Sequence, residues 1–185
     1  SPDGTQIATG STDATAKVFN IADGSEVRVI TTPAPVNDVA FAVESTLIVT
    51  ANEDNKMRTW PLVAPEVPEG ETEKPVKELA GHGGPVTSVE SYGARHELLV
   101  SGSKDNSARL FNAESGASVR TMSHGAAVTG VAINADGTKV VSVSDNKTGK
   151  LWNAADGKLI AEFKGDYQAL ENVANLQRAS ALANR

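Results

Sequence analysis

Short apolar stretches recur along the chain on either side of polar segments. Apolar runs lie before the polar segments at 6–9, 46–50, 97–101 and 139–142, and after them at 26–30, 76–79, 118–122 and 158–163. Asp-Gly or Ser-Gly pairs lie at or near the ends of several runs, at 3–4, 23–24, 115–116, 136–137 and 156–157. Such pairs are typical of tight hairpin turns, because Gly and Asp tolerate a positive φ. The pattern therefore predicts short antiparallel strands joined by hairpins.

The polar segments themselves repeat. They read GSTDATAKVFN at 10–20, ANEDNKMRTWP at 51–61, GSKDNSARLFN at 102–112 and VSDNKTGKLWN at 143–153. The aromatic residues Phe19, Trp60, Phe111 and Trp152 align, with spacings of 41, 51 and 41 residues. A further predicted strand opens three of the units, at 36–41, 86–91 and 128–133. Four strands in each unit predict a four-stranded antiparallel sheet that is repeated along the chain.

The repeated segment, S-x-D-x-[TS]-x-[KR]-[LV]-[WF]-[DN] after an upstream G-H pair, resembles the WD-repeat β-propeller family. The resemblance implies an all-β fold of β-propeller blades over residues 1–164, with units at about 1–30, 31–79, 80–122 and 123–164. These units amount to about four blades, and the first of them lacks one strand. Because propellers of this family usually close with seven blades, we expect an incomplete ring. The remaining blades would come from the same longer chain or from a second copy.

After Phe163 the period changes. Residues 167–185 contain no Gly or Pro, and Leu170, Val173 and Leu176 recur every three residues. This spacing predicts a C-terminal α-helix over 165–185. One interpretation is the start of a coiled coil, since some bacterial WD-repeat proteins resemble this arrangement of a propeller interrupted by a helical segment. The alternative is a short amphipathic helix that packs on the outer blade.

In WD repeats a buried network links an Asp in the turn between the second and third strands to a His, a Ser or Thr, and a Trp. The resemblance places this network on four sets of residues. The candidates are Thr9, Asp13 and Phe19 in the first unit, Thr50, Asp54 and Trp60 in the second, His82, Ser101, Asp105 and Phe111 in the third, and His124, Ser142, Asn146 and Trp152 in the fourth. The second unit has Thr31 and Thr32 where a His would fall. Phe lacks the indole N–H, so the units with Phe19 and Phe111 are expected to have shorter networks.

Catalytic and metal-binding interpretations compete with this structural one. His82, Ser101 and Asp105 are the residue types of a nucleophilic triad. The next unit, however, has the same His and Ser with an Asn in place of the Asp. A catalytic site occurs once in a chain, whereas a network that stabilises the fold recurs in every repeat. The histidines of the third and fourth units lie at equivalent positions in separate blades, which disfavours a shared zinc ion. The Asp-containing turns lack the spacing of a calcium loop. We therefore predict no catalytic, metal or cofactor site.

Composition narrows the class of protein further. The 185 residues carry a net charge of −6, include no cysteine and are 4% aromatic. Disulfides and thiolate metal sites are thereby excluded, and no apolar run is long enough for a membrane helix. The absence of basic clusters argues against a large nucleic-acid surface. Residues 61–75 hold four prolines and four glutamates, a composition typical of an extended loop. We interpret this segment either as a tolerated surface insertion or as a partner-docking or linker element.

The expected function is that of a non-catalytic scaffold that binds protein or peptide partners through propeller faces and loops. The resemblance places loops 31–35, 83–85 and 11–12, together with Lys104, on the narrower face. The alternative is the sensor or docking portion of a larger multidomain protein, with catalysis or electron transfer in another segment. A third possibility, an enzyme in its own right, lacks a non-repeated cluster of acid, base and nucleophile. Nucleic acid is not an expected partner, and no membrane span is expected.

Overall fold

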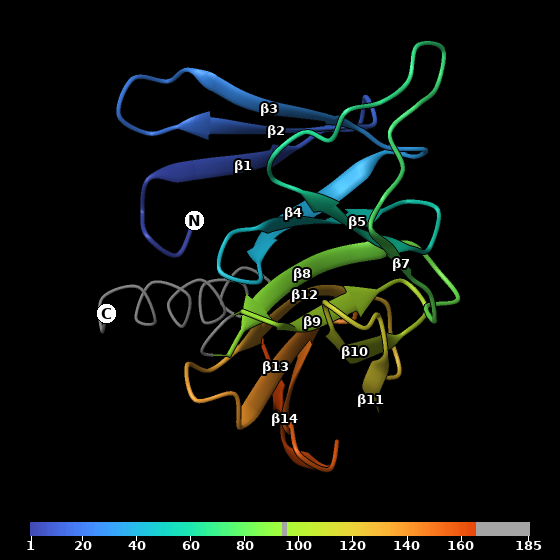
Figure 1. The fold of residues 1–185 in the computed structure, drawn as a ribbon. Helices are drawn as coiled ribbons and strands as arrows, with labels where there is room; N and C mark the ends of the chain where they lie inside the picture. The colour runs from blue at the N-terminus through green and yellow to red at the C-terminus, as the bar shows by residue number, and fades with distance from the viewer. Residues whose placement is uncertain (94–95, 166–185) are drawn as a thin grey trace.

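The computed structural model describes residues 1–93 and 96–165, which fold into four antiparallel sheets stacked one after another (Figure 1). The expected helix over 165–185 lies outside the described residues, apart from Gly165. The first sheet has three strands, β1 (Gln6–Gly10), β2 (Thr15–Asn20) and β3 (Glu26–Thr31). The second has four, β4 (Val36–Ala42), β5 (Leu47–Asn52), β6 (Met57–Pro61) and β7 (Lys77–Leu79).

The third and fourth sheets repeat the order of the second. The third contains β8 (Val86–Tyr92), β9 (Leu98–Ser103), β10 (Ser107–Asn112) and β11 (Ser118–Ser123). The fourth contains β12 (Val128–Ile133), β13 (Lys139–Ser144), β14 (Thr148–Asn153) and β15 (Leu159–Lys164). In every sheet, each strand pairs with the next strand in the sequence, so the local hairpins predicted from the turn residues build the whole sheet.

The turn that precedes the last two strands of each sheet has the same backbone geometry in all four units. One residue of each turn has a positive φ of 65–71°, and these residues are Ala14, Asn55, Asn106 and Lys147. Asn adopts this left-handed conformation more readily than Ala or Lys. Because the conformation persists with all three residue types, the turn is set by the hydrogen bonds around it. This common turn positions the acidic or amide residue that precedes it.

A bulge in the first strand fastens the second sheet to the third and the third sheet to the fourth. The register of β4 skips Asn37, and that of β8 skips Thr87. Asn37 Nδ2 donates to Val86 O at 2.9 Å, and Thr87 Oγ1 donates to Val128 O at 2.7 Å. A bulge leaves its extra residue outside the strand pairing. Each bulged side chain therefore links its own strand to the first strand of the following sheet.

The hydrophobic core consists of three clusters, each lying between consecutive sheets. Between the first and second sheets, Val18 and Ile30 pack against Ile48 and Trp60. The cluster between the second and third sheets includes Met57, Leu79, Leu99 and Phe111, and the cluster between the third and fourth includes Leu110, Met122, Val140 and Trp152. Full burial of one such side chain contributes about 1.5–3 kcal/mol, so these clusters stabilise the packing of each sheet on the next.

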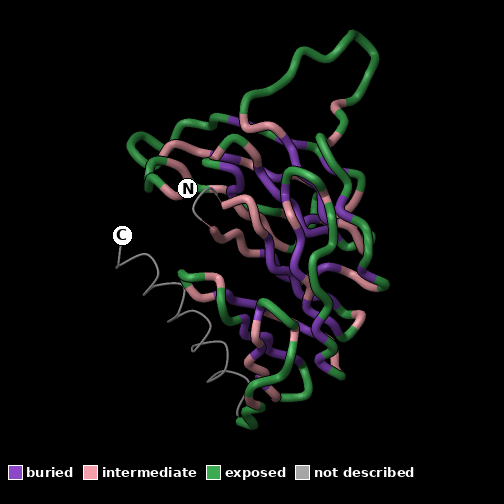
Figure 2. Tube along the Cα trace, turned by 60° about the horizontal axis from the view of Figure 1, so that its bottom comes forward, coloured by how far each residue is buried: buried purple, intermediate pink, exposed green. Residues whose placement is uncertain are grey.

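One face of the first sheet lies open. Ile7 is 52% exposed, whereas Ile48, its equivalent in the second sheet, is completely buried. Figure 2 shows the buried residues gathered along the middle of the molecule and the exposed ones mainly on its loops. The face of each later sheet that carries the Ile48 position packs against the preceding sheet, and within residues 1–93 and 96–165 no sheet precedes the first. The fold is thus all-β, with sheets consistent with propeller blades, and the described residues do not close a ring.

One buried hydroxyl between the second and third sheets lacks a partner. Thr59 is fully buried, and its Oγ1 has no hydrogen-bond partner among the described residues. Apolar residues occupy the equivalent position in the other units, namely Val18, Leu110 and Leu151. Replacing Thr59 by Val keeps the shape and removes the unpaired polar group, so we expect the free energy of unfolding to rise by about 1 kcal/mol.

Chemical denaturation of the intact protein measures this change, and Thr50→Val is the matched control. Thr50 is also fully buried, but its Oγ1 donates to Asn52 and accepts from Trp60. The control should therefore lower the free energy of unfolding by about 1–3 kcal/mol, because it leaves two polar groups unpaired. Equal destabilisation by both substitutions would contradict the assignment of Thr59.

Candidate functional site

The third unit brings its four candidate residues together inside the sheet. His82 lies in the loop before β8, Ser101 on β9 and Asp105 in the turn between β9 and β10. His82 Nδ1 is 2.8 Å from Asp105 Oδ2, and His82 Nε2 is 2.8 Å from Ser101 Oγ. The backbone N–H of Gly83 also donates to Asp105 Oδ2, at 2.9 Å. The ring of Phe111 lies with its centroid 6.1 Å from that of His82 and offers no donor, so no indole N–H extends the hydrogen bonds of this unit beyond Ser101.

The electrostatics of this unit hold the imidazole neutral beside a carboxylate. Burial alone would raise the pKa of Asp105, but hydrogen bonds from Ser107, Gly83 and His82 outweigh it and lower the pKa to about 2. Burial lowers the pKa of His82, and the hydrogen bond to Asp105 opposes this only in part. A carboxylate can only accept, so Nδ1 of the neutral ring is the donor and Nε2 accepts the proton of Ser101.

This connectivity is that of a nucleophilic triad, but its geometry prevents the chemistry. A triad serine must present its oxygen to the carbonyl carbon of a substrate. Ser101 is completely buried and His82 nearly so, so the serine oxygen is not open to a substrate. Among the described residues, no group of three or more acidic or histidine side chains is placed to hold a metal ion. The arrangement therefore links loop, strand and turn within one sheet.

The fourth unit builds a longer chain of contacts from different residues. His124 Nδ1 is 2.7 Å from Ser142 Oγ, to which Trp152 Nε1 donates at 2.8 Å. His124 Nε2 is 2.9 Å from Thr148 Oγ1, which donates to Asn146 Oδ1 at 2.6 Å. Asn146 therefore reaches the imidazole only through Thr148. Burial, reinforced by the charge of the nearby lysine at position 150, lowers the pKa of His124 to about 4.

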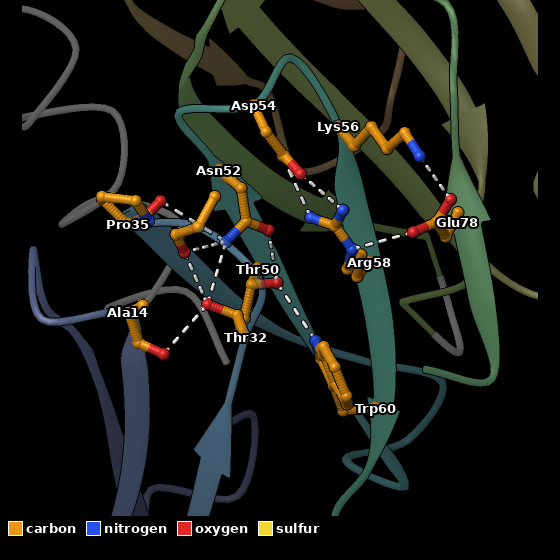
Figure 3. A network of polar contacts seen from close by, with 11 residues as sticks. Ala14, Thr32, Pro35, Thr50, Asn52, Asp54, Lys56, Arg58, Trp60 and Glu78 are labelled. Carbon is orange, nitrogen blue, oxygen red and sulfur yellow. Dashed lines mark hydrogen bonds and ion pairs between the residues drawn. The ribbon is translucent and has the colours of Figure 1, made fainter. Parts of the chain in front are cut away.

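In the second unit an amide stands in for the missing imidazole (Figure 3). Trp60 Nε1 donates to Thr50 Oγ1 at 3.1 Å, and Thr50 Oγ1 donates to Asn52 Oδ1 at 2.9 Å. Asn52 Nδ2 then donates to Ala34 O at 3.0 Å and to Thr32 Oγ1 at 3.3 Å. Asn52 and Thr32 together connect the strand to the loop that precedes β4, a connection that His82 makes in the third unit.

Sequence reasoning missed Asn52 and placed Asp54 in the wrong network. The available signal for Asn52 was its alignment with Ser103 and Ser144, two other polar residues on the corresponding strand, all of them buried. Asp54 was expected to join Thr50, but it pairs with Arg58 instead. With no imidazole to bind, the carboxylate turns to the guanidinium four residues along the chain.

Arg58 is the centre of a separate ion cluster in the second unit. Its side chain is only 2% exposed, with Nη1 3.0 Å from Asp54 Oδ1 and Nη2 2.6 Å from Asp54 Oδ2. Arg58 Nε donates to Glu78 Oε1 at 3.1 Å, and Lys56 donates to the other oxygen of Glu78 at 2.7 Å. The hydrogen bonds from Arg58 lower the pKa of Asp54, against the opposing effect of burial. Figure 3 shows this cluster beside the Thr50 network.

The first unit does not assemble a network among the described residues. Asp13 accepts hydrogen bonds from Thr15, from its N–H at 2.9 Å and its hydroxyl at 2.6 Å. Thr9 is exposed and Phe19 is half-buried, and no hydrogen bond joins Thr9 to Asp13 in the part of the chain that the structure describes. Thr9 lies on the open face of the first sheet, whereas its equivalents are buried by the preceding sheet.

The four structural units correspond to four sequence repeats of a known family. Residues 1–20, 24–61, 73–112 and 116–153 match the family model described as "WD domain, G-beta repeat". The chain belongs to the WD40 repeat family. Each matched segment ends at the last residue of the next-to-last strand of a sheet, in β2, β6, β10 and β14, so the sequence repeat and the sheet are offset by one strand. WD40 repeat proteins typically act as protein-interaction scaffolds, and WD40 domains are generally non-catalytic.

Curated relatives cover part of this chain. It is 33% identical over 89 residues to a coronin-like protein of Saccharomyces cerevisiae, covering 48% of the chain and 14% of that protein. It is 28% identical over 124 residues to the COMPASS component SWD3 of the same yeast, covering 67% of the chain and 37% of that protein. A coronin-like protein of Schizosaccharomyces pombe is 26% identical over 126 residues, covering 64% of the chain and 20% of that protein.

The chain therefore spans between about a seventh and two fifths of the length of these relatives. All three are eukaryotic, and none of them supports the expected likeness to bacterial members of the family. Within the residues that the structure places, no helix combines the length and hydropathy required to cross a bilayer.

Proposed function

We propose that this chain is a non-catalytic scaffold that binds protein or peptide partners through the loops and faces of its blades. The observation that carries the proposal is the burial of Ser101 in the one unit that combines Ser, His and Asp. Ser101 is fully buried and hydrogen-bonded to His82. The residues whose types best suit catalysis therefore stabilise the sheet. Exposed loops on a rigid scaffold are the usual location of binding residues.

The surface that we propose for binding lies on the turns between the second and third strands. Lys104 of the third unit and Glu53 of the second occupy equivalent positions and are exposed. They form an ion pair of 3.4 Å across the two sheets, and Asn37 Nδ2 donates to Glu53 Oε2 at 2.9 Å. This rim offers a partner both charges and an amide without disturbing the buried networks beneath it.

Replacing Lys104 by Glu tests this surface. Lys104 is 54% exposed, so the reversal should leave the melting temperature nearly unchanged, because surface ion pairs contribute about 0–1 kcal/mol. Proteins that co-purify with the intact wild-type protein but not with the variant would be identified by mass spectrometry. Each would then be purified and its affinity for both forms measured. We expect the variant to bind about tenfold more weakly or worse, which is the effect of a residue that matters for binding.

Lys158→Glu is the matched control, because Lys158 also pairs with a carboxylate at 3.4 Å and is 81% exposed, on a hairpin turn of the fourth sheet. Partner binding that survives both reversals would remove this rim from the proposal. The absence of any protein partner for wild type would count against the scaffold function itself.

A second candidate is that the chain is the docking portion of a larger multidomain protein. The much greater length of the matched relatives supports this candidate. The open face of the first sheet, with Ile7 52% and Val29 37% exposed, supports a further blade that covers it, from the same longer chain or from a second copy. Light scattering of the isolated chain separates these two sources. A second copy would give twice the mass of one chain, whereas a blade supplied by a longer chain would leave the mass of one chain.

A further inference from the structure

The insertion at residues 61–75 reaches from the second sheet to the first. It connects β6 to β7, and Figure 1 shows it rising past the end of its own sheet toward β2 and β3. Its outer part is exposed, with Val63 at 82% and Val67 at 39%. Its returning limb is different, because Glu73 is only 16% exposed. Among the described residues, one ion pair thus anchors the insertion between its two ends.

The anchor is an ion pair between Glu73 and Arg28 of β3. Both carboxylate oxygens of Glu73 contact Arg28 Nη2, and Arg28 Nη1 donates to Val29 O at 2.6 Å. Arg28 is 8% exposed, and its Nε has no hydrogen-bond partner among the described residues. A buried guanidinium that is already short of one partner depends strongly on its remaining carboxylate, because an unpaired buried charge is very unfavourable.

Glu73 is distinguished from the neighbouring glutamates by this contact. Glu66, Glu69 and Glu71 lie on the same insertion and are exposed. The four prolines and the short hydrogen-bonded turn at 68–71 give the segment little regular structure of its own. The single ion pair, 45 residues apart in sequence, therefore holds the returning limb against the first sheet.

The anchored limb covers a groove between the first and second sheets. A cavity of about 540 Å³ lies beneath it, lined by Thr72, Glu73 and Pro75 from the limb, Val29 and Thr31 from β3, and Trp60 from β6. The space shows that the limb does not pack tightly onto what it covers. Breaking one contact would then expose the groove without removing a block of core packing.

We propose that the insertion is a strap latched by the Arg28–Glu73 ion pair, and that release of this latch opens the groove over Trp60. The strap spans two blades, so the latch also couples the first sheet to the second. A loop held by one contact belongs to the part of a protein that opens most readily. This inference does not depend on the scaffold function, because it concerns only the intramolecular contact.

Fluorescence quenching of the intact protein tests the latch. The Trp152→Phe background leaves Trp60 as the reporter in this chain, and Phe19 and Phe111 show that Phe fits this position. Acrylamide quenching of Trp60, which is 1% exposed, should increase about threefold or more in Glu73→Gln, since the groove would be open in much of the population. Glu71→Gln, the matched control on the same insertion, should leave quenching unchanged.

Two further measurements distinguish latch release from general destabilisation. The amide of Val76 donates to Thr59 O at 2.8 Å close to the limb, and it should exchange with deuterium about tenfold faster in Glu73→Gln, while amides of β9 and β10 keep their wild-type rates. The charge-swapped variant Arg28→Glu with Glu73→Arg should restore the wild-type quenching of Trp60 and the wild-type exchange rate of Val76. This variant replaces Glu73→Gln in the test if Glu73→Gln fails to fold. Quenching and exchange that match Glu71→Gln would overturn the proposal.

Discussion

Lowering the pH from 7 to 4 is expected to reduce the free energy of unfolding by about 3 kcal/mol through His124 alone. Burial and the charge of Lys150 lower the pKa of His124 from 6.5 to about 4. The folded state therefore favours the neutral ring, and protonation favours unfolding. Each unit of pKa corresponds to about 1.4 kcal/mol, and the stabilisation is present above pH 6.5 and lost as the pH falls toward 4.

Other groups act in the same direction. The lowered pKa of His82 adds to the loss over the acidic range, and Asp105, with a pKa of about 2, adds a further loss below pH 4. Glu162 and Asp145 oppose the shift of His124, but their influence is smaller than that of burial and Lys150. The net prediction is progressive destabilisation by acid, which urea denaturation at several pH values measures.

A pair of lysine substitutions isolates the contribution of His124. Lys150 Nζ donates to His124 O at 2.5 Å, and Lys150→Met should raise the pKa of the imidazole and flatten the dependence of stability on pH. Lys147 lies on the exposed neighbouring turn, so Lys147→Met should keep the wild-type dependence. A His124→Gln variant that retains the full loss between pH 7 and pH 4 would show that this ring is not its source.

Replacing Asp54 by Ala is expected to lower the free energy of unfolding by about 2 kcal/mol. The substitution removes two of the hydrogen bonds to Arg58, whose side chain is 2% exposed. Breaking a buried ion pair costs about 3–5 kcal/mol, and the remaining contact with Glu78 reduces the loss. Glu53→Ala is the matched control, because Glu53 is the adjacent carboxylate and pairs with an exposed lysine, so its loss should stay within about 0.5 kcal/mol.

The double variant separates lost charge pairing from lost packing. Arg58→Leu in the Asp54→Ala background removes the buried charge and fills much of the space with an apolar side chain. Replacement of a whole buried ion pair by hydrophobic residues is often neutral or stabilising. We therefore expect the double variant to recover most of the stability measured by chemical denaturation. A double variant less stable than Asp54→Ala would place the contribution of Arg58 in its packing.

Much of the fold could be predicted from the sequence because its sheets are built from local hairpins. A strand that pairs with its neighbour in sequence needs only a turn and an apolar run, and both are visible in segments such as Asp156–Gly157 between β14 and β15. The contacts of His82, Ser101 and Asp105 could also be anticipated, since these residues keep the residue types of the family pattern. The expected helix over 165–185 remains a prediction.

The side chains that depart from the pattern could not be assigned in this way. Loss of the histidine in the second unit changes the partners of two other residues, so that Asn52 joins Thr50 and Asp54 turns to Arg58. The result depends on which donors lie near each carboxylate or amide in space. Residue types and their spacing carry no information on that choice.

By itself, the sequence determined the period, the strands, the turns and the polar residues available to each unit. Tertiary structure decided which of those residues meet, which of them are buried, and where the insertion returns. Thr9 is exposed although its equivalents are buried, because burial comes from a neighbouring sheet. Arg28 and Glu73, 45 residues apart in sequence, form an ion pair because the first and second sheets are neighbours in space. Hairpins are local and follow from short-range propensity, whereas burial and ion pairing are set by elements that only the stacking of sheets brings together.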